Sequence, residues 1–407
     1  MKTLNERVLD TLSELYRAYG YAKYKMSGFE EYDLYLEYKK FLSTENIITF
    51  TDLHGKLFAL KPDITLSIAK NAKPGEAQKL YYKENVYRAS RETKEYKEIT
   101  QKIRKTLLEL AHVSEEQYTA VLMQGSGTFG VESVLTSAVG KKGKLLIAAN
   151  GAYGERMEDI AKHAGLSYKI LNFHYNETPN AEVIAKEIAQ DPAITHVSIV
   201  HCETTSGILN DIEAVAKKVK EAGRVFIVDA MSSFGGVDIQ VEKLGIDFMI
   251  SSANKCIQGV PGFSFIICKR AELAKCEGQA VSLSLDLFDQ WKGMEKDGKW
   301  RFTSPTHVVL AFAKALEELK EEGGICARNR RYSDNNKLLI QKMKELGFRS
   351  YIDAEHQSPI ITTFFYPETA DFSFEEMYSY IKERGYAIYP GKLTDANVFR
   401  IGNIGEI

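Results

Sequence analysis

One lysine stands in a loop of small residues between two apolar runs. Lys255 lies in SSANKCIQGVPGF, residues 251–263, after the apolar strand GIDFMI and before the strand FSFIIC. A lysine in such a loop cannot easily reach bulk water, and burial favours the neutral amine, which is the form that attacks an aldehyde. Composition alone favours an ordinary surface lysine, so the neighbouring elements must decide between the two interpretations.

A carboxylate closes a strand predicted for the same sheet. Asp229 ends RVFIVD, and side chains at the carboxyl ends of parallel strands line the ligand crevice. A carboxylate there can keep the ring nitrogen of pyridoxal phosphate (PLP) protonated, so that the ring accepts electrons from a carbanion. An aspartate that caps the following turn, MSSFGG, explains the local sequence equally well.

A third candidate is the small-residue turn Gly125-Ser126-Gly127-Thr128, between the strand AVLMQ and the helix FGVESVLTSAV. Small residues let the backbone approach a phosphate, and a helix N-terminus offers unpaired N–H groups. Helix capping by Ser126 or Thr128 is the alternative. The order of phosphate loop, aspartate and lysine, each at a strand end, favours a single cofactor site.

The elements around these residues predict an α/β fold. From about residue 100, short apolar strands alternate with amphipathic helices, which is typical of a mostly parallel sheet covered on both faces. Beyond residue 303 the order is two long helices, 305–322 and 328–347, then strand PIITTFF, helix SFEEMYSYIKERG and strand NVFRIGN. This order predicts a small α+β domain, so the expected domains are 96–303 and 304–407.

Residues 1–95 have a different character. They are rich in Tyr, Lys and Glu and contain an opening helix followed by short alternating strands such as IITFTD and KLFALKPD. The pattern predicts a separate α+β domain with an antiparallel sheet. The change near residue 96 is abrupt.

Composition excludes several classes of function. With 53 Lys and Arg against 55 Asp and Glu, the net charge of -2 gives no overall field for nucleic acid or an anionic membrane. No apolar run approaches the roughly 20 residues of a membrane span, and the start lacks the features of a signal peptide, which predicts a cytoplasmic protein. The five widely spaced cysteines form no CxxC pair and suggest neither a disulfide framework nor a metal site.

Seven phrases carry a resemblance to a known family: VLMQGSGTFGVES, ANGAYGERM, HCETTSGILNDI, VDAMSSFGG, SSANKCIQGVPGF, RFTSPTHVV and FRIGNIGEI. Over about residues 96–407 the chain resembles the class V aminotransferases, PLP-dependent transferases of fold type I, and within them the 2-aminoethylphosphonate:pyruvate transaminases. The resemblance implies transfer of an amino group from 2-aminoethylphosphonate to pyruvate, with phosphonoacetaldehyde and alanine as products.

The resemblance also implies cofactor contacts. Lys255 would hold PLP as a Schiff base, Asp229 would pair with the pyridinium, and Gly127 and Thr128 would bind the phosphate. Tyr153 would lie against the ring face, although a packed aromatic at a helix start is its alternative.

Three further residues take roles by the same resemblance. Thr205 would lie near the ring hydroxyl, with a turn-forming threonine as the alternative. Thr306 would reach the cofactor phosphate of a neighbouring subunit, which implies a homodimer. Capping of the helix that follows is the alternative role for Thr306. Arg400 would anchor phosphonate and carboxylate in turn through a two-pronged contact, with a surface ion pair as the alternative.

Residues 1–95 resemble another family. The stretches YGYAKYKMSGFEEYDLY, FTDLHGKLFALKPDITLSIAKN and KLYYKENVYRASRETKEYKE are similar to the histidyl-tRNA synthetase-like regulatory subunit of ATP phosphoribosyltransferase. Asp63, Thr65 and Arg88 would be its possible ligand contacts, or would merely pack the sheet. Both resemblances meet at EYKEI, residues 95–99, as expected for a recombination or gene-prediction join.

The join gives two expectations and three hypotheses. We expect a missing family N-terminal segment and a truncated C-terminal domain. The hypotheses are a working PLP transaminase, a PLP-binding but inactive fusion, and a regulatory subunit that acts through residues 1–95.

Overall fold

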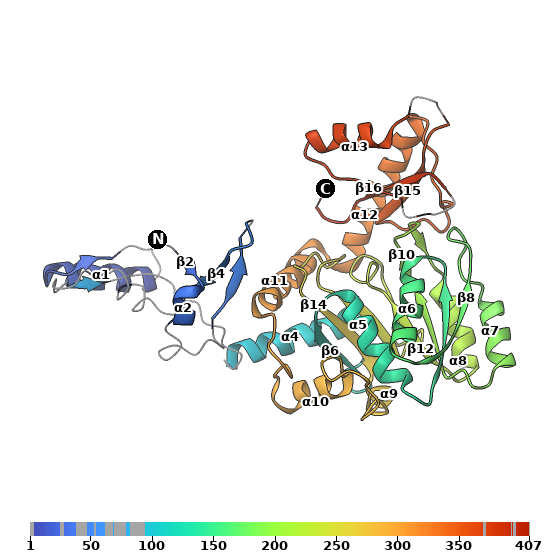
Figure 1. Ribbon diagram of the computed structural model, residues 1–407, viewed down its shortest axis with the longest axis horizontal. Coiled ribbons are helices and arrows are strands. Elements are labelled where there is room, and N and C mark those ends of the chain that lie inside the picture. The colour runs from blue at the N-terminus through green and yellow to red at the C-terminus, as the bar shows by residue number, and fades with distance from the viewer. Residues whose placement is uncertain are drawn as a thin grey trace. The chain divides into compact units, whose positions relative to one another are not determined.

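The computed structural model describes residues 4–24, 28–37, 47–52, 54–61, 68, 79–81, 94–368, 372–391, 393 and 396–406. The chain divides into two compact units, Met1–Thr93 and Lys94–Ile407 (Figure 1). Asp63, Thr65 and Arg88 lie outside the described residues. In the part of the chain that is described, no helix is long and apolar enough to cross a membrane.

The first unit combines short helices with short strands. After α1 (Leu4–Ala18), strand β1 (Ala22–Lys23) pairs in parallel with β5 (Leu80–Tyr81). Strands β2 (Phe29–Glu31), β4 (Leu57–Leu60) and β3 (Thr49–Thr51) form an antiparallel sheet in that order, beside α2 (Asp33–Glu37). The opening helix and the antiparallel strands predicted for this part of the chain are therefore present.

The second unit is built on a seven-stranded sheet. Its strand order is β6-β14-β13-β12-β9-β7-β8, in which β14 is antiparallel to both neighbours and the other pairs are parallel. The bounds are β6 Tyr118–Gln124, β7 Lys144–Ala149, β8 Ser167–Asn172, β9 His196–Val200, β12 Val225–Asp229, β13 Phe248–Ser252 and β14 Phe263–Lys269. The central strands β12 and β13 are buried over all but the first residue of β12, because helices cover them.

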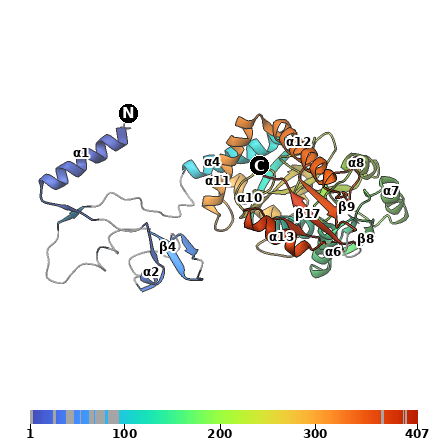
Figure 2. The same ribbon diagram turned by 90° about the horizontal axis from the view of Figure 1, so that it is seen from above.

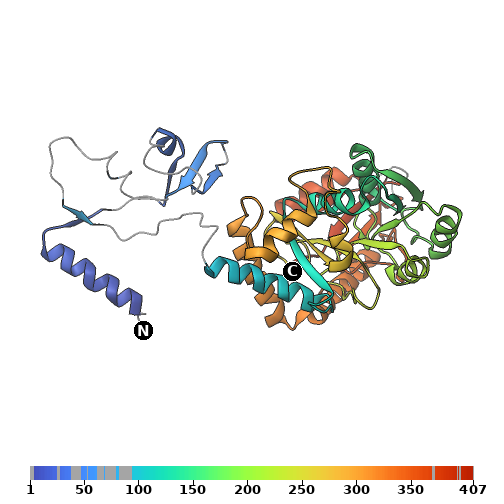
Figure 3. The same ribbon diagram turned by 90° about the horizontal axis from the view of Figure 1, so that it is seen from below.

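Helices before, between and after these strands pack on the sheet. Helices α5 and α6 lie on β13, β14 and β7, whereas α4 and α10 lie beside β6 (Figure 3). The bounds are α4 Lys94–Leu110, α5 Gly127–Val134, α6 Ala152–His163, α7 Ala181–Gln190, α8 Ile212–Glu221, α9 Arg270–Ala274 and α10 Leu287–Asp297. Helix α5 continues as the π-helix η2 (Leu135–Val139), and a small hairpin joins β10 (Cys202–Glu203) to β11 (Ile208–Leu209).

The C-terminal elements form a smaller layer. Helices α11 (Thr306–Glu322) and α12 (Gly324–Glu345) lie side by side, and α12 leads from the large sheet to the small one (Figures 1 and 2). The small antiparallel sheet has the order β15 (Ile361–Phe365), β17 (Val398–Gly402), β16 (Tyr389–Pro390), with α13 (Phe374–Glu383) packed nearby. A further domain boundary at residue 303 stays a prediction.

Candidate active site

Loops at the carboxyl ends of β6, β12 and β13 meet around one cavity of about 470 Å³. Parallel strands bring such loops to one edge of a sheet, which explains why residues far apart in sequence share it. Five of the predicted residues line the cavity: Gly127, Thr128, Tyr153, Asp229 and Lys255.

Asp229 carries a buried carboxyl group at the end of β12. The side chain is 5% exposed, and its Oδ1 accepts a hydrogen bond of 2.9 Å from the backbone N–H of Met231. Burial raises the pKa of Asp229 to about 6, and the nearby Glu203 adds to the rise, while Lys255 and Arg156 oppose it. A carboxyl group held in this way is stabilised as the anion when a cation is placed beside it.

Lys255 is half-buried at the turn that follows β13. Its carbonyl accepts a hydrogen bond from the N–H of Gln258, and the N–H of Gly259 donates to the carbonyl of Ala253. Within the described residues, the ammonium of Lys255 forms no ion pair. Its amine is therefore available to a molecule in the cavity.

The turn before α5 has the features of an anion cradle. Gly125 has a φ of +114°, and Ser126 precedes the helix without a capping hydrogen bond from its side chain. A Cβ on Gly127 would lie 2.2 Å from the sulfur of Met231, so a side chain there would require Met231 to move. The predicted alternative, capping by Ser126, is not what the structure shows.

Arg156, which lines this cavity, and Glu203, which binds the backbone of one of its lining residues, were not singled out from the sequence. Arg156 lines the cavity, donates a hydrogen bond of 3.3 Å to Thr128 Oγ1, and stacks 4.8 Å from the ring centre of Tyr153. Its position three residues after Tyr153 on α6 was the available signal, since such residues share a helix face. Glu203 is fully buried and accepts hydrogen bonds from the N–H of Tyr153 and from the hydroxyl of Thr205.

Three predicted residues, Thr205, Thr306 and Arg400, lie outside the residues that line the cavity. Thr205 is fully buried, and its hydroxyl donates to Glu203 at 2.6 Å while it accepts from the N–H of Ala152. Thr306 is the first residue of α11, where its N–H donates to the carbonyl of Ser304. Thr205 thus helps to fix the start of α6.

Arg400 is a buried cation on β17. The residue is 7% exposed, its guanidinium donates to the carbonyl of Thr204 at 2.8 Å, and it lies 5.7 Å from the ring centre of Tyr389. Burial lowers its pKa. No carboxylate of the described residues forms an ion pair with it, so the surface ion pair weighed as its alternative is absent there. A buried guanidinium without a carboxylate partner suits an anionic ligand.

Comparison with known families decides what this arrangement belongs to. The family model for the class V aminotransferases matches residues 75–401, which is most of the chain and includes every residue predicted to bind PLP or the amino-transfer substrates. This chain is a class V aminotransferase.

Relatives of the aminotransferase agree with the resemblance predicted from its sequence. A 2-aminoethylphosphonate–pyruvate transaminase of Lysinibacillus sphaericus is 59% identical over 313 residues, 77% of this chain and 85% of the relative. The protein of the same name from Bacteroides fragilis is 54% identical over 310 residues, 76% and 85% of the two chains.

Solved structures confirm the predicted fold class of the aminotransferase. An aspartate aminotransferase from Thermus thermophilus superposes with a TM-score of 0.70 at 26% identity, over 77% of this chain and 86% of the other. An alanine–glyoxylate aminotransferase from Nostoc sp. gives a TM-score of 0.72 at 20% identity, over 85% and 88%, which shows the fold alone.

The N-terminal part matches a second family. The histidyl-tRNA synthetase model covers residues 2–102, so the two family matches overlap over residues 75–102. The synthetase-like character predicted for this part is confirmed, and its likeness to a regulatory subunit stays a prediction.

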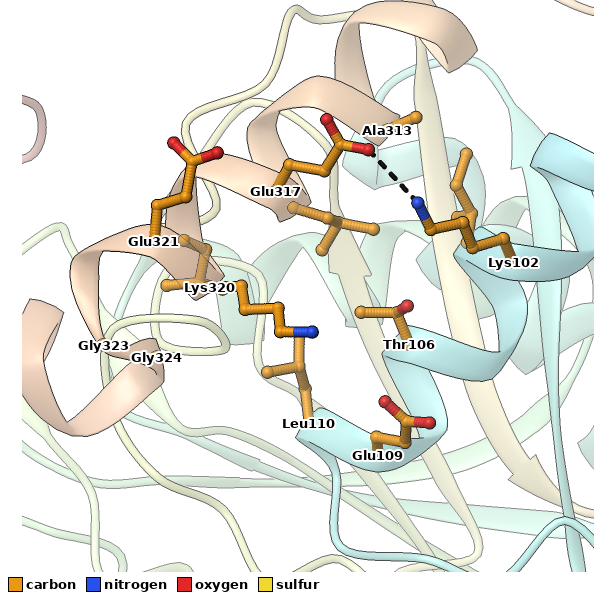
Figure 4. A pocket seen from close by; sticks show the side chains of 13 residues that line it. Lys102, Thr106, Glu109, Leu110, Ala313, Glu317, Lys320, Glu321, Gly323 and Gly324 are labelled. Carbon is orange, nitrogen blue, oxygen red and sulfur yellow. Dashed lines mark hydrogen bonds and ion pairs between the residues drawn. The ribbon is translucent and has the colours of Figure 1, made fainter.

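The aminotransferase has a larger cavity, of about 650 Å³, between α4 and α11. Figure 4 shows Lys102 of α4 reaching across to Glu317 of α11, at an N–O distance of 3.2 Å, with Thr106 and Leu110 nearby. None of the predicted site residues lines it. Size alone therefore does not identify the active site, and the smaller cavity that holds Lys255 and Asp229 is the candidate.

Proposed function

We propose that this aminotransferase transfers the amino group of 2-aminoethylphosphonate to pyruvate, as a cytoplasmic homodimer that uses PLP. The products are phosphonoacetaldehyde and alanine. The observation that carries the proposal is the shared cavity of Lys255 and Asp229 in a chain 54–59% identical to transaminases of that name.

The residues present fit PLP. Asp229 would hold the ring nitrogen, because its buried carboxyl group, with a pKa raised to about 6, gains from an adjacent cation. The turn at Gly127 and Thr128 would hold the phosphate at the N-terminus of α5, with Tyr153 at the ring. When bound, PLP supplies an aldehyde that condenses with amines and a ring that accepts electrons from the adjoining carbon.

Lys255 would serve as the base in both half-reactions. In the first half-reaction its amine would take a proton from the substrate carbon that bears the amino group and deliver one at the C4′ position of the cofactor, and in the second half-reaction it would move a proton in the opposite direction. Asp229 would keep the ring nitrogen protonated in both half-reactions. Arg400 binds the phosphonate in the first half-reaction and the pyruvate carboxylate in the second, since a guanidinium fits both anions.

An exposed apolar surface supports the homodimer. Phe129, Leu283 and Phe302 are 48%, 73% and 45% exposed, and Phe129 and Phe302 line a cavity that shares Gly125 with the active site. Apolar patches of this kind are typical of interfaces. Thr306 follows four residues after Phe302, and we propose that it reaches the cofactor phosphate of a second copy. Light scattering after size exclusion should give twice the chain mass of 45.9 kDa, and a monomer would contradict this.

A cofactor titration tests the proposed reaction. The purified protein should gain a visible absorbance band with PLP, and 2-aminoethylphosphonate should remove that band until pyruvate restores it. Lys255→Ala should abolish the band, because the linkage to the amine is lost. A protein that takes up no PLP would overturn the proposal, whereas a stable band without response to the amine would leave a PLP-binding, inactive protein.

The match of residues 2–102 to a synthetase family favours one other candidate. The N-terminal unit would then act as a regulatory subunit of ATP phosphoribosyltransferase. Histidine binding by calorimetry, or co-purification with the phosphoribosyltransferase, should follow, and the absence of both would dismiss it.

A further inference from the structure

The first turns of α12 bind the loop that carries Lys255. Arg328 is 2% exposed, and one terminal nitrogen of its guanidinium donates to the carbonyls of Cys256 and Ile257, at 2.9 and 3.1 Å. These are the two residues that follow Lys255. Hydrogen bonds from helix α12 therefore hold the backbone beside the reactive amine.

The same helix supports an unusual backbone conformation in this loop. Gln258 has a φ of +65°, in the left-handed region that L-residues other than glycine seldom adopt. Its side-chain N–H donates to the hydroxyl of Tyr332 on α12 at 2.6 Å, and that hydroxyl lies 3.5 Å from the carbonyl of Cys256. Residues in such conformations persist where the surroundings fix them, commonly at functional sites.

Helix α12 also holds the loop that follows Asp229. The side-chain N–H of Asn329 donates to the carbonyl of Gly236 at 2.6 Å. The thiol of Cys256 donates to the carbonyl of Ser232 at 3.3 Å, which joins the two loops directly. One helix thus fixes both loops whose side chains meet in the cavity.

Glu322, the last residue of α11, fixes the guanidinium itself. Its carboxylate pairs with Arg328 at 2.7 Å and with Arg331 at 2.8 Å, and the hydrogen bond from Arg331, helped by that from Arg328, keeps its pKa below the usual range. The planar guanidinium can reach a carboxylate and two carbonyls at once, which a lysine ammonium on a flexible stem reproduces poorly.

We propose that Arg328 is a positioning residue for Lys255, acting through the carbonyls of Cys256 and Ile257. The proposal rests on the proposed function, in which the Lys255 amine moves a proton between two carbon atoms. Arg328 does not line the cavity, so its effect passes through the loop. A displacement of about 1 Å in a reacting group can cost on the order of 10²-fold in rate.

Arg331 supplies a matched control, because it pairs with the same carboxylate but donates to the carbonyl of Gly405 and not to the loop. Amide hydrogen exchange of residues 253–259 in the cofactor-free protein should be faster in Arg328→Met and unchanged in Arg331→Met. Arg328→Lys, which keeps the charge and guards against a folding failure, should also exchange faster. The proposal would be overturned if Arg328→Met and Arg328→Lys exchanged these amide hydrogens no faster than Arg331→Met.

Kinetics of the PLP-loaded protein separate positioning from simple destabilisation. In Arg328→Lys, kcat for 2-aminoethylphosphonate should fall on the order of 10²-fold, with KM within about twofold of wild type. A loss confined to KM, or an equal loss of kcat in Arg331→Met, would contradict positioning. If the wild-type protein takes up no PLP, the proposed function fails, while the exchange experiment still decides whether Arg328 fixes the loop.

Discussion

The carboxyl group of Asp229 couples folding to pH. Burial raises its pKa from 3.8 to about 6, so the neutral form is favoured in the folded state. Below pH 3.8 the carboxyl group is neutral in both the folded and the unfolded chain, so its burial carries no ionisation cost. As the pH rises from 3.8 through 6, the free energy of unfolding falls by about 3 kcal/mol, because the carboxylate is less stable in the interior than in water. In cofactor-free protein, Asp229→Asn should therefore melt several degrees higher than wild type at pH 8, with the difference shrinking toward pH 4.

Calorimetric melts across that pH range check this expectation. The order should reverse once PLP is bound, because the ring cation then stabilises the carboxylate and an amide cannot replace it. A constant difference between the two cofactor-free proteins at all pH values would show that the ionisation of Asp229 is not the cause.

Arg400 should affect both half-reactions together. If its guanidinium anchors phosphonate and carboxylate in turn, Arg400→Lys should lower kcat/KM for 2-aminoethylphosphonate and for pyruvate by about 10- to 100-fold each, mainly through KM. Single-turnover measurements of each half-reaction provide the test. A loss limited to one substrate would mean that the other anion binds elsewhere, and Arg156, which lines the cavity, is then the alternative.

Among single residues, those of the candidate site that lie at or just after the end of a strand could be predicted from the sequence. Asp229 ends an apolar strand, Lys255 and Gly127 each follow one, and the parallel order brings strand ends together. The contribution of Glu203 could not be predicted, because its partner Tyr153 is 50 residues away and the contact depends on how a hairpin meets a helix start. The contact of Arg328 with the Lys255 loop could not be predicted for the same reason, because it joins segments far apart in the sequence.

Among the elements, the start of α7 depends on one side chain. Asn180 accepts hydrogen bonds from the N–H groups of Glu182 and Val183, which would otherwise lack partners at the helix start. Asn180→Ala should lower the free energy of unfolding by about 1 kcal/mol, while Asn180→Asp should lose little. Urea unfolding measures both. Equal losses in the two variants would show that capping is not what Asn180 contributes.

Most strands and long helices of the second unit could be predicted from apolar periodicity, but their ends depend on local geometry. The pattern gave helices at 305–322 and 328–347, whereas α12 begins at Gly324, directly after Gly323 ends α11 with a φ of +108°. The predicted helix 129–139 changes to a π-helix at Leu135. Such shifts depend on backbone hydrogen bonding, which the pattern of apolar side chains does not reveal.

For the whole molecule, the core of the second unit draws on residues from Tyr96 to Leu316, all of them within that unit. A protein that begins at Lys94 should therefore fold, bind PLP and keep the main thermal transition of the full chain within about 3 °C, because domains with their own core can fold alone. Calorimetry and the PLP absorbance band measure this. A truncated protein that stays unfolded would show that residues 1–93 contribute to this core.

The position of β6 has a consequence for synthesis on the ribosome. This strand stands at one end of the large sheet, where its neighbour is β14, and the Met123–Ser264 contact between them spans 141 residues. At about 5–20 residues per second, the apolar segment YTAVLM emerges roughly 7 to 28 seconds before its partner. Throughout that interval the nascent chain exposes an unpaired apolar strand, so its yield in a cell should depend on chaperones that shield such segments.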